Sequence, residues 1–248
     1  MYNNYAEKKT VISILDSCKN LSTIDQTVQL LKQNTLIILN FKLYSFFLTI
    51  ELIMKCFWKT NMTNELNGFK VAILATDGFE QSEMEKPKKA LEEAGAIAHL
   101  ISPTAESVKG WKDKNWGDKF KTDLTLEKAK AQDYDALVLP GGVMNPDQLR
   151  IHPQAINFIM DFVKNDKPIA AICHGPWTLI DAQGVKGKTM TSWPSIKLDL
   201  INAGANWVDR EVVRDGKLVT SRKPDDLPAF NSEMIKLFSE SKNARGAL

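Results

Sequence analysis

The chain contains few of the residues that build disulfide frameworks and metal sites. Its 248 residues include three cysteines and three histidines, and none of them form a Cys-x-x-Cys or His-Glu-x-x-His pair. A small, odd number of cysteines argues against a disulfide scaffold and is typical of proteins from reducing compartments. The sequence therefore favours a cytoplasmic protein with no metal site, and nothing in it indicates another cofactor.

An excess of charge of one sign is also lacking. The chain has 32 basic and 30 acidic residues, a formal net charge of +2. Such a balance provides no broad basic surface for nucleic acid. Between residues 104 and 126, Trp111, Trp116 and Phe120 alternate with charged residues and glycine, which can indicate base stacking. With balanced charge, we interpret this stretch as a loop or small hairpin whose tryptophans cover a cleft or an interface.

Proline and glycine are absent from the first 67 residues, although the whole chain has 10 and 13 of them. Within this segment, residues 36–58 are strongly apolar, as a membrane-spanning helix requires. Four polar or charged side chains interrupt the run, and charges at the centre of a spanning helix cost several kcal/mol each. The interrupting residues are Asn40, Lys42, Glu51 and Lys55. No signal-peptide cleavage site follows the run.

Three interpretations of this segment remain open: a membrane anchor, a helical segment that packs on the core or on a partner, and a stretch that is not part of the mature protein. We favour the third, with Met62 as the true start, because the residues after it make a complete domain of about 185 residues. We therefore predict that residues 1–67 are a disordered or loosely helical extension and that residues 68–243 are the folded domain. A membrane partner is not expected.

From residue 70 onward, apolar runs typical of buried strands alternate with amphipathic stretches typical of helices. This alternation predicts an α/β fold with a mainly parallel sheet covered by helices on both faces. Pro87 lies inside the first helical stretch and predicts a kink or a later start of that helix. The expected strands are 71–75, 97–101, 136–139, 169–172 and 218–220, and the expected helices are 82–94, 152–164, 178–182, 194–203 and 227–239.

The most informative stretch is the run from Pro168 to Trp177. A short apolar strand ends abruptly at Cys173, followed by His174, Gly175 and Pro176 and then by a helical pattern. This order predicts a sharp strand-to-helix turn with the thiol at its tip, a nucleophile elbow that lacks the Gly-x-Ser-x-Gly signature. The helix N-terminus would favour the thiolate. The alternative is a buried structural cysteine.

Two other predicted strands end in unusual residues, and the carboxyl ends of parallel strands share one edge of the sheet. Glu80 and Glu83 follow the first strand, where acidic residues also favour a helix N-terminus and Ser82 is a candidate cap. Beside Cys173, a protonated Glu83 would donate a hydrogen bond to the thiolate and tune its pKa.

Gly141 and Gly142 follow the strand at 136–139. Their N–H groups, with that of His174, are candidates for an oxyanion hole, although a tight turn alone would also explain the two glycines. The imidazole of His174 is the candidate base. A base needs a third group to orient it, for which Asp147, from this chain or a neighbouring subunit, is the best candidate. We also assign Glu80 and Trp177 to the substrate-binding set.

Several of these stretches together resemble the ThiJ/PfpI superfamily, and within it the PfpI-type intracellular cysteine peptidases and general stress proteins. The resemblance implies a flavodoxin-like three-layer sandwich with the cysteine elbow of class I glutamine amidotransferases. It also implies that Cys173 is the nucleophile, Glu83 the carboxyl that hydrogen-bonds it and His174 the base. Asp147 falls where PfpI-type members carry an acidic residue that completes a triad across a subunit interface. The matching stretches are 77–83, 139–142, 146–150, 171–176, 200–205, 219–222 and 224–227.

The resemblance implies three alternative functions. The favoured one is a cysteine hydrolase acting on peptides or other acyl or amide bonds, with a stress-protective role. The second is glyoxalase-type or deglycase-type chemistry on methylglyoxal or glycated groups. The third is a redox sensor or holdase in which Cys173 oxidises to a sulfinate stabilised by Glu83. The expected partners are a small aldehyde or a peptide or protein substrate, and further copies of the chain in a dimer or hexamer.

Overall fold

The computed structural model describes residues 65–103 and 106–246. Most of the predicted extension, including the apolar stretch 36–58, lies outside the described residues. Its last three residues form a turn that belongs to the domain, because the Leu66 side chain is fully buried and the Leu66 N–H donates to the Ala94 carbonyl at 2.9 Å. At the other end, the last helix continues to Gly246.

The centre of the domain is a seven-stranded sheet in the order β11-β12-β8-β7-β1-β3-β6. All neighbouring pairs are parallel except β11 and β12, which are antiparallel at one edge. The middle strands are buried along nearly their whole length, which explains why their sequences are continuous apolar runs. The strands are β1 (Lys70–Leu74), β3 (Ile97–Ser102), β6 (Leu124–Thr125), β7 (Ala136–Leu139), β8 (Ile169–Ile172), β11 (Val212–Asp215) and β12 (Leu218–Ser221).

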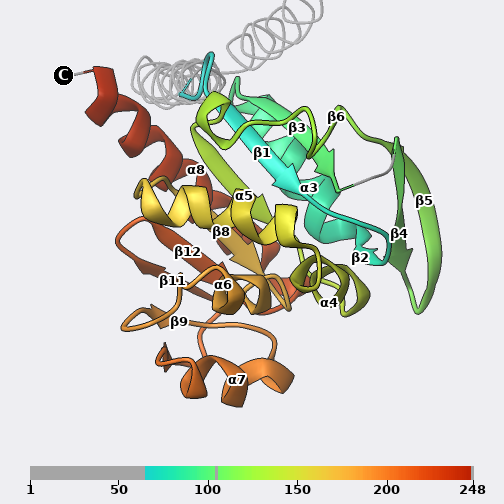
Figure 1. Cartoon of the computed structure of the whole chain (residues 1–248). Helices are drawn as coiled ribbons and strands as arrows, with labels where there is room; N and C mark the ends of the chain where they lie inside the picture. Colours follow the sequence, from blue (N-terminus) through green and yellow to red (C-terminus); the bar gives the residue numbers. More distant parts are fainter. Residues whose placement is uncertain (1–64, 104–105, 247–248) are drawn as a thin grey trace, which may run out of the picture. The chain divides into compact units, whose positions relative to one another are not determined.

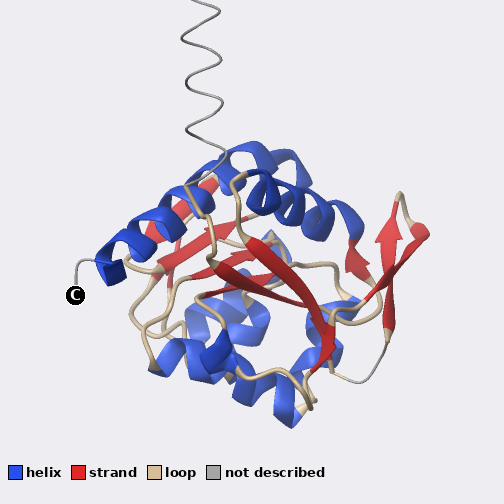
Figure 2. Cartoon of the chain, turned by 90° about the horizontal axis from the view of Figure 1, so that it is seen from above, coloured by secondary structure: helices blue, strands red, loops and turns tan. Residues whose placement is uncertain are grey.

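Helices cover both faces of this sheet, as Figures 1 and 2 show. On one face, α3 (Gln81–Glu93) and α8 (Leu227–Gly246) pack against one core cluster. On the other face, α5 (Pro153–Lys164), α6 (Trp177–Asp181) and α7 (Lys197–Asn202) pack against a second cluster. This arrangement confirms the predicted three-layer sandwich with a mainly parallel sheet.

Of the two outcomes predicted for the helix that contains Pro87, a kink or a later start, the later start is wrong. The helix begins at Gln81 and continues through the proline to Glu93. The proline lacks the N–H that would join the helical ladder, a loss that is unfavourable in a helix interior. Burial of Met84, Pro87 and Leu91 on the core compensates for this loss.

The stretch between residues 104 and 126 contains a hairpin, in agreement with the prediction. Strands β4 (Ser107–Lys112) and β5 (Asn115–Lys121) pair antiparallel, and β4 also pairs with the two-residue strand β2 (Phe79–Glu80). The hairpin lies beside the main sheet (Figure 1). Strands β6 and β11 and a small sheet of β9 (Thr189–Met190) and β10 (Asn206–Trp207) were not predicted from the sequence.

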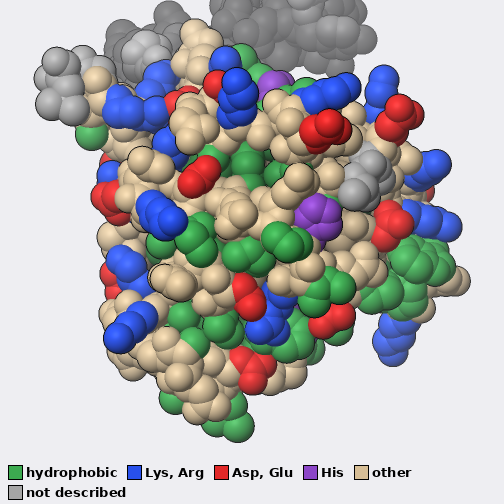
Figure 3. Space-filling view, viewed as in Figure 1, with side chains coloured by type: hydrophobic (Ala, Val, Ile, Leu, Met, Phe, Trp, Pro, Cys, Tyr) green, Lys and Arg blue, Asp and Glu red, His purple; other side chains and the backbone are tan. Residues whose placement is uncertain are grey.

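The surface carries charges of both signs side by side, as the face in Figure 3 shows. This mixing agrees with the formal net charge of +2. Within residues 65–103 and 106–246, no helix combines the length and the apolar character needed to cross a bilayer.

Candidate active site

Three neighbouring strands bring the candidate residues to one cleft. The strands β8, β7 and β1 lie next to one another, so the segments after their carboxyl ends meet at one edge of the sheet. The cleft there has a volume of about 520 Å³, within the usual range for small-molecule sites. It is lined by Gly78, Glu80, Glu83, Trp111, Gly142, Val143, Met144, Cys173, His174, Trp193 and Pro224. The predicted convergence of the three strand ends is confirmed.

Cys173 occupies a strained turn between β8 and α6. Its φ is +61°, a left-handed conformation that is uncommon for a residue with a side chain. Two backbone hydrogen bonds fix this turn: the Cys173 N–H donates to the Ser221 carbonyl at 3.0 Å, and the Cys173 carbonyl accepts from the Trp193 N–H at 2.9 Å. The turn points the thiol into the cleft, with only 6% of the residue exposed.

His174 contacts the thiol although the two residues are adjacent in sequence. Its Nδ1 lies 3.2 Å from Cys173 Sγ, and its Nε2 lies 3.0 Å from Ser195 Oγ. Burial lowers the pKa of His174 to about 4, so the imidazole is neutral at pH 7. With the proton on Nε2 and donated to Ser195, Nδ1 is free to accept the thiol proton.

Glu83 lies in the first turn of α3 and is completely buried. Its Oε2 accepts the Gly141 N–H at 2.9 Å. Burial, and then the negative charge of Glu80, raise the pKa of Glu83 to about 8, against the opposing effect of the Gly141 N–H. The carboxyl beside the thiol is therefore protonated at pH 7 and can donate to the sulfur.

Opposing effects act on the thiol itself. Burial raises the pKa of Cys173, and an ionised Glu83 would raise it further, whereas hydrogen bonds from the N–H groups of Gly142 and His174 lower it. The net direction is upward, opposite to the effect predicted from a helix N-terminus. The reason is that α6 has only five residues and begins at Trp177, while the sulfur is deeply buried. The thiol therefore keeps its proton until a base removes it.

The structure corrects the role of Gly141. Its N–H is committed to Glu83, so the donors available for an oxyanion are the N–H groups of Gly142 and His174. A Cβ on Gly141 would lie 2.6 Å from Cys173 Cβ and 2.8 Å from the His174 nitrogen. Glycine is needed at this position because the two strand ends approach closely.

Asp147 and Trp177 do not line the cleft in the described chain. Asp147 is exposed in the first turn of α4 (Met144–Arg150), and within the described chain the Nε2 of His174 contacts Ser195. The orientation of His174 by Asp147 of a neighbouring subunit stays a prediction. Trp177 is half-buried on α6, between His174 and the Arg150 guanidinium, whose carbon lies 4.7 Å from the indole centre. Five of the eight predicted residues line the cleft: Cys173, His174, Glu83, Glu80 and Gly142.

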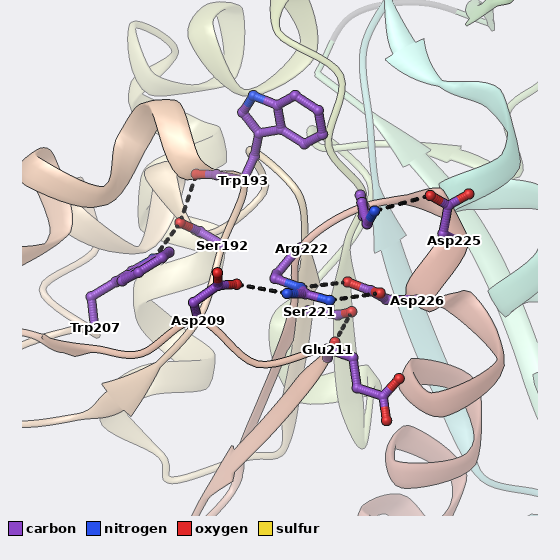
Figure 4. Close-up of polar contacts among 10 residues, drawn as sticks. Ser192, Trp193, Trp207, Asp209, Glu211, Ser221, Arg222, Asp225 and Asp226 are labelled. Atoms are coloured by element: carbon purple, nitrogen blue, oxygen red, sulfur yellow. Dashed lines mark hydrogen bonds and ion pairs between the residues drawn. The ribbon is translucent and has the colours of Figure 1, made fainter.

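A segment that was not predicted from the sequence holds His174 from the other side. The Trp193 indole stacks on the imidazole at 6.0 Å, and Ser195 binds its Nε2. Figure 4 shows how this segment is anchored: Trp207 Nε1 donates to Ser192 Oγ at 3.0 Å, and Ser192 Oγ donates to the Trp193 carbonyl at 3.0 Å. Nothing in the run Ser192 to Ser195 indicates its proximity to the elbow, because only the fold brings them together.

Possible metal ligands were sought around this site as well. In the described parts of the chain, no three His, Cys, Asp or Glu side chains are grouped so that they could hold a metal ion.

Replacing Glu83 by glutamine is expected to give a protein whose free energy of unfolding exceeds that of the wild type by a margin that grows as pH rises. Between pH 4.5 and 8 the folded chain keeps the Glu83 proton while the unfolded chain loses it, so this group lowers stability with increasing pH. Between pH 4.5 and pH 7 Glu83 lowers the free energy of unfolding by about 3 kcal/mol, and Glu83→Gln removes this loss. The amide still offers an oxygen to Gly141.

Chemical unfolding of both proteins across this pH range measures the effect. Glu93→Gln, the same change at an exposed position on α3, is the control and should follow the wild-type curve. Parallel pH curves for wild type and Glu83→Gln would show that Glu83 is ionised in the folded protein.

Comparison with known proteins places the chain in a family. The chain belongs to the DJ-1/PfpI family, whose model matches residues 69–237. The Bacillus subtilis protein named "Putative cysteine protease YraA" is 48% identical over 169 residues, which cover 68% of this chain and 97% of that protein. An uncharacterized protein of Archaeoglobus fulgidus is 46% identical over 168 residues, covering 68% of this chain and 97% of its own length.

A solved structure agrees with these sequence matches. A two-domain protein from Anabaena variabilis, with DJ-1/ThiJ/PfpI-like and ferritin-like domains, superposes with a TM-score of 0.64 at 36% identity. The superposition covers 68% of this chain and 47% of that protein, so the chain spans about half of it. The predicted family and fold are therefore confirmed.

Proposed function

We propose that this protein is a cysteine-dependent hydrolase that cleaves acyl bonds in peptides or related compounds. The observation that carries the proposal is the contact between Cys173 Sγ and a neutral His174 imidazole at 3.2 Å, in a cleft with N–H donors facing the sulfur. A thiol with a base in reach is the arrangement that nucleophilic catalysis requires. The name of the Bacillus subtilis relative supports the same class.

The first step uses His174 as the base. Sγ attacks the carbonyl carbon while the thiol proton passes to Nδ1, and the electron pair of the carbonyl bond moves to its oxygen. The Gly142 and His174 N–H groups, which face the sulfur in the free protein, are placed to donate to this oxyanion. The Ser195 hydroxyl oxygen accepts a hydrogen bond from the Nε2–H of His174 and keeps the imidazole oriented.

The second step returns the proton. An imidazolium with a pKa of about 4 is a strong enough acid to protonate the leaving group as the tetrahedral intermediate collapses to a thioester. Water then attacks the thioester with His174 again as the base, and release of the acid restores the thiol. Glu83, protonated at pH 7, donates to the sulfur whenever it carries negative charge.

The protonated Glu83 also favours a second candidate function. A thiol that adds to an aldehyde needs a proton for the carbonyl oxygen, and a buried acid with a pKa of about 8 can supply it at neutral pH. Glyoxalase-type or deglycase-type chemistry on methylglyoxal or glycated groups is therefore our alternative. The redox or holdase role, the stress-protective context and the homo-oligomer with Asp147 from a second copy stay predictions.

Trapping the acyl-enzyme tests the proposal. The full-length protein is mixed with an activated ester and with fluorogenic peptides, quenched with acid and mapped by mass spectrometry. We expect a burst close to one equivalent, an acyl group on the Cys173 peptide and continued peptide turnover. Lactate from methylglyoxal without acyl transfer would support the aldehyde function instead. The absence of both activities would overturn the assignment of a Cys173-dependent enzyme.

A further inference from the structure

The charge inside the cleft is confined to one side chain. Besides the Cys173 thiol, the acidic or basic side chains among its lining residues are those of Glu80, Glu83 and His174. Glu83, with a pKa of about 8, is protonated at pH 7, and His174, with a pKa of about 4, is neutral. The Glu80 carboxylate is then the charge that an incoming molecule meets beside the thiol.

Glu80 is held firmly in the wall of the cleft. It is the last residue of β2 and the N-cap of α3, and its side chain is half-buried. Its N–H donates to the Gly141 carbonyl at 3.3 Å, next to the oxyanion donor Gly142. Its Oε1 accepts the Ser82 hydroxyl at 3.0 Å, so the carboxylate lies in a defined place near the reacting atoms.

Aromatic faces accompany this carboxylate. Trp111 is the β-sheet partner of Glu80 in the β2–β4 pairing, and its side chain lines the cleft. Trp193 lines it from the side of His174 and is 38% exposed. Aromatic faces attract ammonium and guanidinium groups, and more strongly where water is partly excluded.

One basic group next to the lining residues is paired with a carboxylate. Lys223 precedes the lining residue Pro224, and its ammonium is paired with Asp225 at 3.1 Å. The cleft therefore offers one carboxylate, two indoles and no unpaired cation among its lining residues.

We propose that Glu80, Trp111 and Trp193 form a subsite for a positively charged group of the substrate, an ammonium or guanidinium, and that the cleft disfavours anionic substrates. This inference deepens the proposed hydrolase function and rests on it for the identity of the substrate. The subsite would select peptides or acyl compounds with a basic side chain beside the scissile carbonyl.

Charged thiol reagents test the subsite without requiring turnover. A methanethiosulfonate forms a mixed disulfide with Cys173 and releases methanesulfinate, so its rate reports access to the sulfur. We compare the trimethylammonium-ethyl and sulfonato-ethyl reagents on the full-length protein, reading the Cys173 peptide by mass spectrometry and normalising to a small free thiol. We expect the cationic reagent to react at least about 10-fold faster, with the ratio falling as salt is added.

Glu80→Gln is the decisive variant. Loss of the carboxylate is expected to bring the ratio of the two rates close to 1, while Glu93→Gln, exposed on α3, leaves it unchanged. Because Glu80 helps to raise the pKa of Glu83, both proteins are labelled at a pH well below 8, where Glu83 keeps its proton in the variant as well. An equal ratio in wild type and Glu80→Gln, or faster reaction with the anionic reagent, would overturn the proposed subsite.

A matched peptide series connects the subsite with the reaction. Peptides that differ only in lysine, norleucine or glutamate beside the scissile bond should be cleaved in that order of kcat/KM, with the lysine preference reduced about 10-fold by Glu80→Gln. A charge preference in labelling without any peptide cleavage would refute the hydrolase function and leave the subsite in place. Cleavage without preference for lysine would refute the subsite and leave the hydrolase function in place.

Discussion

Replacing Cys173 by serine is expected to reduce hydrolysis at least about 10³-fold. Serine has nearly the same shape as cysteine, but its hydroxyl is a far weaker acid than a thiol. The His174 imidazole is a weak base, with a pKa of about 4, and it cannot take a proton from an alcohol efficiently. The site is therefore suited to a thiol and not to a serine nucleophile. Initial rates with the fluorogenic peptides measure the loss.

Two controls test whether the loss of activity comes from the missing thiol alone. The thermal midpoint of Cys173→Ser should stay close to that of the wild type, because the smaller polar atom still faces the N–H groups of Gly142 and His174. The same replacement at Cys56, outside the part matched by the family, should leave the rate unchanged. If Cys173→Ser kept most of the wild-type rate, the thiol would not be the nucleophile.

Replacing Gly142 by alanine is expected to lower activity about 100-fold, the usual cost of losing an oxyanion-hole donor. The new Cβ would lie 2.4 Å from the Gly78 carbonyl oxygen and 2.6 Å from the Glu80 nitrogen. Both are backbone atoms, so the chain itself must shift and move the Gly142 N–H from the sulfur. We also expect destabilisation by about 1–3 kcal/mol beyond the backbone strain.

Gly187 provides a matched control for backbone strain. Its φ of +77° is close to the +75° of Gly142, but a Cβ there would meet nothing within 4 Å. Gly187→Ala should therefore cost only the left-handed strain, about 1 kcal/mol, and leave the rate unchanged. If Gly142→Ala and Gly187→Ala lost activity equally, the loss would come from general destabilisation and not from displacement of the Gly142 N–H.

The parts of the fold that were predicted correctly depend on local sequence patterns. Buried parallel strands read as short apolar runs, and the run before Cys173 ends at a turn that only a few residue types tolerate. The convergence of Gly78, Gly142 and Cys173 then follows from the general rule that parallel strands share a carboxyl edge. Proximity that arises from regular sheet geometry can be inferred from sequence.

Contacts made by irregular segments were not predictable in this way. Ser195 reaches His174 because Trp207 and Cys173 anchor the segment before it, and these contacts join residues far apart in the chain. The pKa of the thiol was expected to fall because a helix follows the elbow, but it is raised. The shortness of α6 and the depth of burial of the sulfur could not be predicted from the local sequence. Asp147 has the acidic residue type of the family pattern, but its side chain is exposed in the described chain.

The hairpin of β4 and β5 forms a wall of the cleft that is separate from the residues proposed to react. The nucleophile, the base and the oxyanion donors lie directly after strands β8 and β7 of the main sheet. Trp111 lines the cleft from the hairpin, which is joined to the rest of the domain through the two-residue pairing of β2 with β4. A change in the length or composition of this hairpin alters one wall of the cleft and leaves the elbow untouched. In this fold one wall of the cleft and the reacting groups are thus carried by separate segments, and a change in the hairpin should alter substrate choice before it alters the reaction.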